Sequence, residues 1–439
     1  MKRVFVQSYG CRASQADGAA IEASLEDSGF RPVRDASQAD LVVLNTCTVT
    51  HSADIDTRRV IRGLQRDHPD AEILVTGCYA QRAPAELAAL PGVRWVIGNS
   101  RKTQIAELFT PGEFVWQKTT EDYHGEILVD DISQLSAFAA TPVRGIRGDR
   151  TRPNLKIQDG CPNRCSFCII PSVRGGRSRS ATVESVVAQV NQLATRYREI
   201  VLSGINLGRW GRDLSPQLRF FDLLRLLLVE TPVERLRISS VEPMDWSAGL
   251  LEFIAAQPRI ARHVHLPLQS GSDAVLKRMF RKYRSRHYAS RLQLAHTLLP
   301  NAALGADVMT GFPGETDAEF AETVEFVEQQ PFTYLHVFTY SERPGTPAAT
   351  YANPVPPEVR HERTRLLREL SARKNLAFRR RQLDQTLSAV TLEQPGFALT
   401  TNFLKIKLAA NRPPNQLIDV TIGSQDETGL REKETLHVL

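Results

Sequence analysis

LKIQDGCPNRCSFC, residues 155–168, joins a short apolar run to three cysteines, Cys161, Cys165 and Cys168. The run is typical of a buried strand, and the cysteines follow it within eight positions. A tetrahedral zinc site or a ferredoxin-type cluster takes four thiolate or imidazole ligands. Either a fourth ligand lies elsewhere in the chain, or one coordination position is open to a molecule that is not protein.

Five further apolar runs follow, each ending in Gly or a polar residue, with helical stretches between them. They are EIVLSGIN (199–206), RLRISSVEP (235–243), HVHLPLQSGS (263–272), LGADVMTGFPGE (304–315) and YLHVFTYSERPGT (334–346). Six strand and helix units predict a barrel or partial barrel of the (β/α) kind. In such barrels the chemistry lies at the carboxyl ends of the strands, where the three cysteines are predicted.

The first 100 residues predict a second parallel α/β sheet. Apolar runs at 4–6, 41–44 and 73–75 alternate with helical stretches, and Cys11, Cys47 and Cys78 each follow one of these runs. Loops after adjacent parallel strands converge at one edge of a sheet. The three cysteines are therefore predicted to form a second three-thiolate site, with isolated buried cysteines as the alternative.

The rest of the chain predicts a linker and a small β domain. Residues 110–150 lose periodicity and indicate a linker or edge segment, and NPVPPEV (353–359) ends the barrel pattern before a basic helix. Alternating apolar residues after that helix predict several short strands. We therefore expect four segments: 1–115 (α/β), 116–147 (linker or edge), 148–380 (partial (β/α)6 barrel and basic helix) and 381–439 (small all-β domain).

Composition indicates a multidomain protein without a membrane span. The chain has 439 residues, 42% of them hydrophobic and 24% charged. Neither a signal peptide nor a long apolar run is evident, so we expect a cytoplasmic protein that contacts no membrane. Cytoplasmic thiols stay reduced, and a disulfide framework is therefore not expected for the six cysteines.

The net charge of +6 is unevenly distributed. Residues 358–381 hold nine Arg or Lys against three Glu, and the runs at 277–286 and 143–152 are also basic. Such runs indicate either solvated faces or a polyanionic partner such as nucleic acid. Residues 383–439 hold five Lys or Arg against seven Asp or Glu, so the small β domain is slightly acidic.

Three thiolates on a cubane [4Fe–4S] cluster leave one iron without a protein ligand, and an open iron can chelate a small molecule directly. The zinc alternative needs a nearby fourth ligand, and the nearest histidines in the sequence are His124 and His263. We predict no residue that acts as a general acid or base, because the chemistry would take place on the clusters.

The spacing of Cys161, Cys165 and Cys168, with Phe167 before the last cysteine, resembles the signature of radical S-adenosylmethionine (SAM) enzymes. The wider chain resembles the methylthiotransferase branch of that superfamily in SYGC, NTCTVT, TGCYAQ, HLPLQSGS and GADVMTGFPGET. The resemblance implies two [4Fe–4S] clusters, one on each cysteine trio, SAM as methyl and radical source, and a C-terminal TRAM domain.

NTCTVT, RKYRSRHY and the short C-terminal domain resemble the members that methylthiolate C2 of N6-threonylcarbamoyladenosine next to the anticodon of tRNA. That implies tRNA as partner, an electron donor such as flavodoxin or ferredoxin, and a monomer. The alternatives are a methylthiotransferase acting on isopentenyladenosine in tRNA or on a ribosomal-protein aspartate, and a non-catalytic iron–sulfur or RNA-binding protein.

Other positions have weaker signals. Phe167, Gly204 and Gln269 are predicted to contact the cofactor, although Gly204 can instead serve a strand-end turn and Gln269 a polar layer inside the barrel. The arginines after the cysteine loop are predicted to meet RNA phosphate or the threonyl carboxylate, or else to be solvated loop residues; they are Arg174, Arg177 and Arg179.

Overall fold

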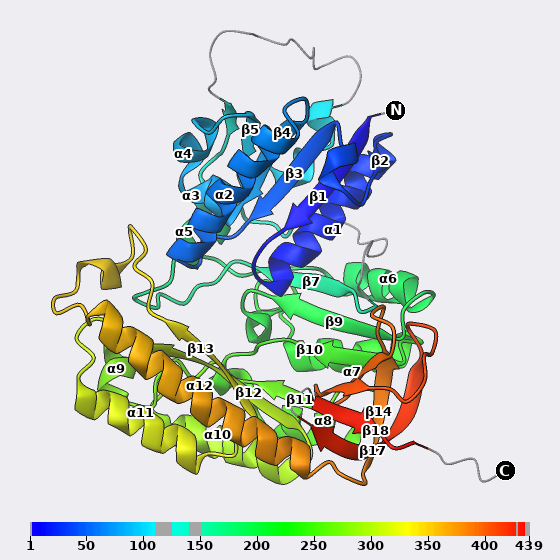
Figure 1. The fold of residues 1–439 in the computed structure, drawn as a ribbon, viewed down its shortest axis with the longest axis vertical. Coiled ribbons are helices and arrows are strands. Elements are labelled where there is room, and N and C mark those ends of the chain that lie inside the picture. Colours follow the sequence, from blue (N-terminus) through cyan, green and yellow to red (C-terminus); the bar gives the residue numbers. More distant parts are fainter. Residues whose placement is uncertain (1, 110–124, 140–150, 427–428, 435–439) are drawn as a thin grey trace.

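The fold is described from a computed structural model, in which residues 2–109, 125–139, 151–426 and 429–434 are described. Figure 1 shows an N-terminal sheet above a curved set of strands, with a small β-barrel at one end of those strands. The junctions predicted at 115–116 and 147–148 lie outside the described residues. Helix α12 ends at Arg380, next to the third predicted junction, and the division into domains stays a prediction.

The N-terminal sheet has six parallel strands in the order β2-β1-β3-β4-β5-β6. They are β1 (Arg3–Ser8), β2 (Arg31–Pro32), β3 (Leu41–Thr46), β4 (Glu72–Gly77), β5 (Val93–Ile97) and β6 (Glu126–Leu128). Every residue of β3 is buried, as in a parallel sheet covered on both faces. The predicted parallel α/β fold is confirmed, and β6 places part of the expected linker at the sheet edge.

Helices cover both faces of this sheet. One face packs against Ile21 and Leu25 of α1 (Arg12–Asp27), and the other packs against Ile61 of α2 (His51–Asp67). Two short helices, α3 (Cys78–Arg82) and α4 (Pro84–Ala88), follow β4. Because each helix follows a parallel strand, α1, α2 and α3 all begin at the same edge of the sheet.

The six predicted barrel strands are all present. They are β7 (Asn154–Asp159), β9 (Glu199–Gly204), β10 (Arg235–Ile238), β11 (His263–His265), β12 (Ala303–Thr310) and β13 (Tyr334–Thr339). They form two sheets, β10-β9-β7-β8 and β11-β12-β13, where β8 (Arg179–Ser180) is antiparallel to β7. A single parallel bridge from Leu236 to Ile260 links the two sheets, so the barrel is partial, as predicted.

Helices on the outside of the barrel complete the strand and helix units. They are α6 (Val183–Ala194), α7 (Phe220–Glu230), α8 (Ala248–Ala256), α9 (Asp273–Arg278), α10 (Ser285–Leu298), α11 (Asp317–Gln329) and α12 (Pro357–Arg380). The short helix α5 (Ile170–Arg174) instead packs beside Cys78 of the N-terminal part. Helix α11 starts with a reciprocal cap between Thr316 and Glu319. In the described ranges, no helix has the length and apolarity needed to cross a membrane.

The C-terminal part is a closed barrel, which confirms the predicted small all-β fold. Its strands are β14 (Thr386–Thr391), β15 (Phe397–Thr400), β16 (Lys405–Lys407), β17 (Leu417–Asp426) and β18 (Gly429–Glu432). Closure leaves no exposed sheet edge. Arg237 of β10 donates hydrogen bonds to the carbonyls of Thr400 and Thr401 at 2.9 and 3.0 Å, which fastens the small barrel to the large one.

The basic helix predicted at 358–381 is α12, but part of its charge is neutralised within the protein. Arg363 is buried and pairs with Glu315 at 2.8 Å. Arg365 pairs with Glu362 and Glu369 on the same helix. These pairs reduce the charge that the helix offers to a polyanion, and an RNA contact at α12 stays a prediction.

Candidate active site

The N-terminal cysteines follow the carboxyl ends of three neighbouring strands. Cys11, Cys47 and Cys78 come after β1, β3 and β4, respectively. Gly10, at φ 91°, lies so close to the second loop that an added Cβ would be 2.8 Å from the Cys47 sulfur. The Cys47 thiol also lies within electrostatic reach of Cys78 and Cys11. The structure therefore brings together three cysteines that span 68 positions of the chain.

Gly10→Ala is expected to lower the iron bound by the chain toward the roughly four atoms of a single cluster, because the new methyl group would push Cys47 out of position. Left-handed φ adds about 1 kcal/mol of backbone strain. Gly29→Ala is the matched control, since Gly29 has φ 89° and nothing within 4 Å of an added Cβ. Iron counting after anaerobic reconstitution compares the two, and equal iron would show that the Gly10 contact does not position Cys47.

The second trio lies in the loop between β7 and α5. The Ser166 amide donates to the Met279 carbonyl at 3.1 Å, and the Ser166 hydroxyl donates to the Arg278 carbonyl at 2.8 Å. These bonds tie the loop to the end of α9. The Cys168 thiol lies within electrostatic reach of Cys165 and Cys161, so these three cysteines also form one group.

The spacing of the sulfurs does not match the compact geometry of a single zinc ion. Zinc–sulfur bonds of about 2.3 Å hold the sulfurs of a tetrahedral site about 3.8 Å apart. In the described part of the chain, neither trio has all its sulfurs within 4.8 Å of one another. His263 bonds to the Tyr334 hydroxyl at 2.7 Å at the other end of the barrel strands, and His124 lies outside the described residues.

The thiols need a cation to lose their protons. Burial raises the pKa of Cys47 to about 12 and the pKa of Cys168 also to about 12. A metal supplies the positive charge that deprotonates a thiol and holds the thiolate in place. The chemistry of both trios therefore fits iron–sulfur clusters.

Among the described residues, arginine and asparagine side chains donate four hydrogen bonds to these sulfurs. They are Arg174 to Cys78 at 3.2 Å, Asn99 to Cys78 at 3.6 Å, Arg281 to Cys165 at 3.2 Å and Asn206 to Cys161 at 3.5 Å. Donors to cluster sulfurs tune the reduction potential. The sequence analysis missed these roles, although Asn206 lies in the quoted LSGIN stretch and Arg281 in a basic run. Asn99 had no sequence signal.

Arg281 corrects the interpretation of the basic run 277–286. Besides Cys165, its guanidinium contacts Glu242 at 2.5 Å, and its side chain is 5% exposed. Arg278 in the same run pairs with Glu319 at 2.7 Å. Two of the arginines assigned to a solvated or polyanion-binding face therefore have carboxylate partners within the protein, and Arg281 is buried. Of the run 143–152, only residues 151 and 152 are described.

Arg174 connects the barrel to the N-terminal trio. It lies at the end of α5 but donates to Cys78, 96 positions earlier in the chain. Its guanidinium also pairs with Asp17 of α1 at 3.0 Å and with Asp159 of β7 at 3.3 Å. The side chain is fully buried, so these contacts lie at the junction of the two parts.

Two lysines join the same buried network. Lys102 pairs with Asp17 at 2.7 Å, and Lys156 pairs with Asp17 and with Asp159. With Arg174, three cations face two carboxylates, which leaves one positive charge in excess beside Cys78. This excess positive charge stabilises the negative charge of a thiolate at Cys78.

The three loop arginines differ from one another. Arg174 and Arg179 are 1% and 3% exposed, and Arg179 donates to the Arg174 carbonyl at 2.7 Å. The interpretation as solvated loop arginines is wrong for these two, because the loop turns back at Gly175, at φ 89°. Neither offers an exposed guanidinium to RNA phosphate or to a carboxylate. Arg177 is exposed, and its contact with RNA stays a prediction.

The predicted cofactor contacts lie near the carboxyl ends of the barrel strands. Gln269 is buried at φ 70°, and its side-chain oxygen has no hydrogen-bond partner among the described residues. Phe167 packs beside Met309 and Phe312. A Cβ at Gly204 would lie 3.1 Å from Gln158, so packing alone can require glycine there. An unpartnered buried oxygen fits a polar cofactor, and all three contacts stay predictions.

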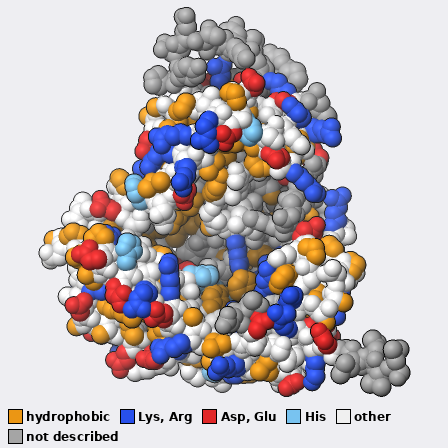
Figure 2. Space-filling model, in the orientation of Figure 1, with side chains coloured by type: hydrophobic (Ala, Val, Ile, Leu, Met, Phe, Trp, Pro, Cys, Tyr) orange, Lys and Arg blue, Asp and Glu red, His pale blue; other side chains and the backbone are white. Residues whose placement is uncertain are grey.

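The face seen in Figure 2 is hollowed between the N-terminal sheet and the barrel. Lys or Arg and His side chains lie inside this hollow. In the barrel, His265, Asp307 and His336 have ligand atoms within 4.8 Å of one another, a group that the sequence analysis did not single out. Burial lowers the pKa of His265 to about 4, so its imidazole is neutral at pH 7.

Comparison with known families gives two matches on this chain. Residues 3–98 match the uncharacterized protein family UPF0004, and residues 155–327 match the radical SAM superfamily. Each matched range contains one complete cysteine trio. In fold, the chain is similar to the radical SAM methyltransferase TsrM from Kitasatospora setae, with a TM-score of 0.56, 16% identity, and coverage of 79% of this chain and 76% of that one.

Three curated relatives cover most of the chain. Two are called threonylcarbamoyladenosine tRNA methylthiotransferase MtaB: the Bacillus subtilis protein is 40% identical over 84% of this chain and 80% of its own, and the Aquifex aeolicus protein is 34% identical over 96% and 100%. A Clostridium botulinum tRNA-2-methylthio-N(6)-dimethylallyladenosine synthase is 32% identical over 85% and 83%. With two converging cysteine trios and this similarity along its length, the chain belongs to the radical SAM methylthiotransferase family.

Proposed function

We propose that this enzyme adds a methylthio group to C2 of N6-threonylcarbamoyladenosine, next to the anticodon of tRNA. The observation that carries the proposal is Arg174, which leaves the loop of the barrel trio and bonds to Cys78 of the N-terminal trio. This contact joins the segment that follows the barrel trio to the N-terminal trio, which supports a single site bordered by both trios, as insertion of sulfur at a carbon requires. The relatives from Bacillus subtilis and Aquifex aeolicus support the choice of substrate.

We propose that each trio holds one [4Fe–4S] cluster. When bound, the clusters and SAM supply the radical, the sulfur and the methyl group of the reaction. The chain itself holds the clusters through its thiolates, donates hydrogen bonds to their sulfurs from Arg281, Asn206 and Arg174, and ties the barrel loop to α9. Phe167, Gly204 and Gln269 are proposed to contact SAM, and no side chain is assigned as a general acid or base.

The remaining partners are also proposals. A radical SAM reaction consumes electrons. We propose that a small electron donor such as flavodoxin or ferredoxin supplies them. We propose that the enzyme acts as a monomer in the cytoplasm, where tRNA is modified, and that Arg177 contacts the RNA. The small C-terminal barrel would serve as the TRAM-like module.

The substrate is tested by mass spectrometry of nucleosides after reaction with SAM and dithionite. We expect a methylthio product with tRNA that carries threonylcarbamoyladenosine, and no product with tRNA that carries isopentenyladenosine or with ribosomal protein. A product on isopentenyladenosine or on the ribosomal-protein aspartate would replace the proposed substrate. Failure to cleave SAM at all would instead support a non-catalytic iron–sulfur or RNA-binding protein.

A further inference from the structure

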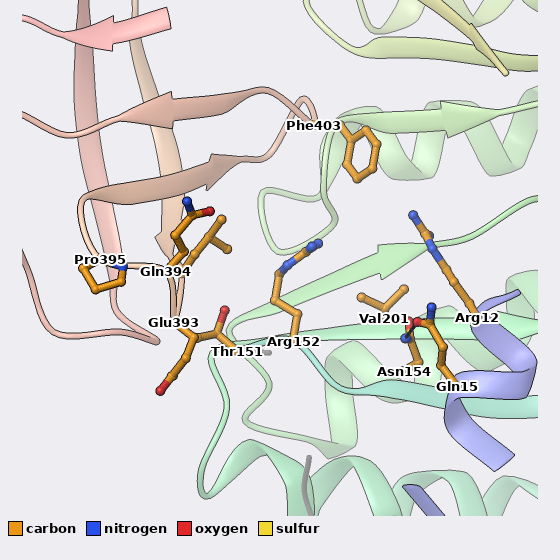
Figure 3. A pocket seen from close by; sticks show the side chains of 11 residues that line it. Arg12, Gln15, Thr151, Arg152, Asn154, Val201, Glu393, Gln394, Pro395 and Phe403 are labelled. Atoms are coloured by element: carbon orange, nitrogen blue, oxygen red, sulfur yellow. Dashed lines mark hydrogen bonds between the residues drawn. The ribbon is translucent and has the colours of Figure 1, made fainter. Parts of the chain in front are cut away.

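A pocket of about 650 Å³ lies where the N-terminal sheet, the large barrel and the small barrel meet. Its lining comes from α1, from the start of β7, from β9 and from two loops of the small barrel. The charged and aromatic residues among the lining are Arg12, Arg152, Glu393 and Phe403. Figure 3 shows the Arg12 and Arg152 side chains reaching from two sides toward the space beside the Phe403 ring.

Arg12 has no hydrogen bond or ion pair within the described part of the chain. Its guanidinium carbon lies 5.8 Å from the centre of the Phe403 ring, a weak contact that leaves its five N–H donors free. Burial lowers the pKa of Arg12, and the charges of Arg237 and Arg152 lower it further, while Tyr334 and Glu199 oppose this. A half-buried guanidinium without a partner among the described residues is available to a ligand that brings an anion to it.

Among the described residues, the surroundings of the pocket have more arginine than carboxylate side chains. Glu199 is the shared partner of Arg152, Arg235 and Arg237, at 3.2, 3.6 and 2.7 Å. Its single carboxylate therefore has no capacity left for Arg12. Glu393 is exposed and lies in a loop of the small barrel, where water screens its charge. The positive charge that lines the pocket therefore favours binding of an oxyanion.

Arg12 directly follows Cys11 at the start of α1, so the lining of the pocket includes the neighbour in sequence of one proposed cluster ligand. On the proposed function, the C2 atom of the adenine must reach that trio, while the threonylcarbamoyl group on N6 projects away from C2 and ends in a carboxylate. Arginine binds carboxylates through two parallel N–H bonds.

We propose that Arg12 binds an oxyanion of the substrate RNA, namely the carboxylate of the threonylcarbamoyl group, with Phe403 packed against the same group. This inference rests on the proposed function. The carboxylate contact predicted for Arg174 or Arg179, which are buried and paired, is assigned instead to Arg12, which has no partner among the described residues. A backbone phosphate is the other oxyanion that the pocket could accept, and the experiment separates the two.

The test measures binding of two anticodon stem–loop RNAs to the anaerobically reconstituted full chain without reductant. One RNA carries threonylcarbamoyladenosine, and the other carries unmodified adenosine at the same position. We expect Arg12→Gln to weaken binding of the modified RNA by about 10- to 100-fold, the range of a hydrogen bond to a charged group, and to leave binding of the unmodified RNA unchanged. Arg12→Lys should restore part of the loss, because it keeps the charge without the bidentate geometry.

Arg31→Gln is the control for loss of one positive charge. Arg31 is exposed and pairs in register with Arg3 at the start of β1, at the opposite end of the sheet from Cys11. The iron content and the cluster absorption spectrum of the Arg12→Gln variant should match those of the wild-type enzyme. Equal weakening on both RNAs would identify a phosphate site and overturn the carboxylate assignment.

The outcomes also distinguish this inference from the proposed function. If the wild-type enzyme prefers the modified RNA and Arg12→Gln keeps that preference, Arg12 does not read the carboxylate. If the wild-type enzyme shows no preference and forms no methylthio product on the modified RNA, the proposed substrate is wrong.

Discussion

Replacing Cys161, Cys165 and Cys168 together by Ala is expected to abolish SAM cleavage and to lower the iron content from about eight to about four atoms per chain. The physical reason is that these thiolates are the only proposed ligands of the cluster that binds SAM. Cys161 and Cys165 also receive hydrogen bonds from Asn206 and Arg281, so these variants remove the thiolates and the bonds to them together. Iron assay and chromatographic detection of 5′-deoxyadenosine under dithionite measure both effects.

The complementary variant is Cys11, Cys47 and Cys78 to Ala. It should also retain about four irons, but it should still cleave SAM while forming no methylthio product. The pair of variants assigns a separate role to each trio. About four irons in the wild-type protein, or SAM cleavage by the first variant, would contradict the two-cluster proposal.

Glu199→Gln is expected to lower the free energy of unfolding by about 3–5 kcal/mol, the cost of leaving a buried charge without its partner. Glu199, Arg235 and Arg237 are almost completely buried, and the carboxylate is the shared partner of these arginines and of Arg152. Glutamine keeps the shape of the side chain but removes the charge. Urea unfolding of the metal-free full chain, followed by circular dichroism, measures the change.

Glu234→Gln is the matched control for this substitution. Glu234 pairs with Arg198 at the surface, where the two side chains are 43% and 52% exposed, so its loss should cost less than about 1 kcal/mol. Similar losses of stability for the two variants would contradict the structure, in which Glu199 and its arginine partners are buried.

The carboxylate of Glu199 should also make the stability of the fold depend on pH. Burial alone would raise the pKa of Glu199, but Arg237, Arg152 and Arg235 overcome this effect and lower the pKa to about 2 from 4.5. A lowered pKa means that the carboxylate stabilises the fold above about pH 4.5 and that this contribution is lost as the pH falls toward 2. The stability difference between wild type and Glu199→Gln should therefore shrink over this interval.

Local patterns in the sequence were sufficient to predict the folds of the three parts. Each of the six barrel strands is a short apolar run that ends in Gly or a polar residue, and each N-terminal cysteine follows such a run. Because parallel topology brings the ends of strands together, these patterns also predicted that Cys11, Cys47 and Cys78 meet.

Contacts between distant segments could not be predicted in this way. Arg174 and Arg177 are three positions apart in one loop, yet one is buried against Cys78 and the other is exposed. Arg281 belongs to a run of basic residues but faces Cys165. The sequence shows the charge of each arginine, whereas its partner depends on which segments of the folded chain pack beside it.

The amino-acid sequence by itself determined the two cysteine trios, the strand and helix order and the family, because ligand spacing and hydrophobic periodicity are local properties of the chain. Only the tertiary structure decided which arginines are free. Burial makes an unpaired charge costly, so Arg174, Arg179 and Arg281 are each held by internal partners. Arg12 has no such partner among the described residues, and it lies at the pocket that we assign to the substrate carboxylate.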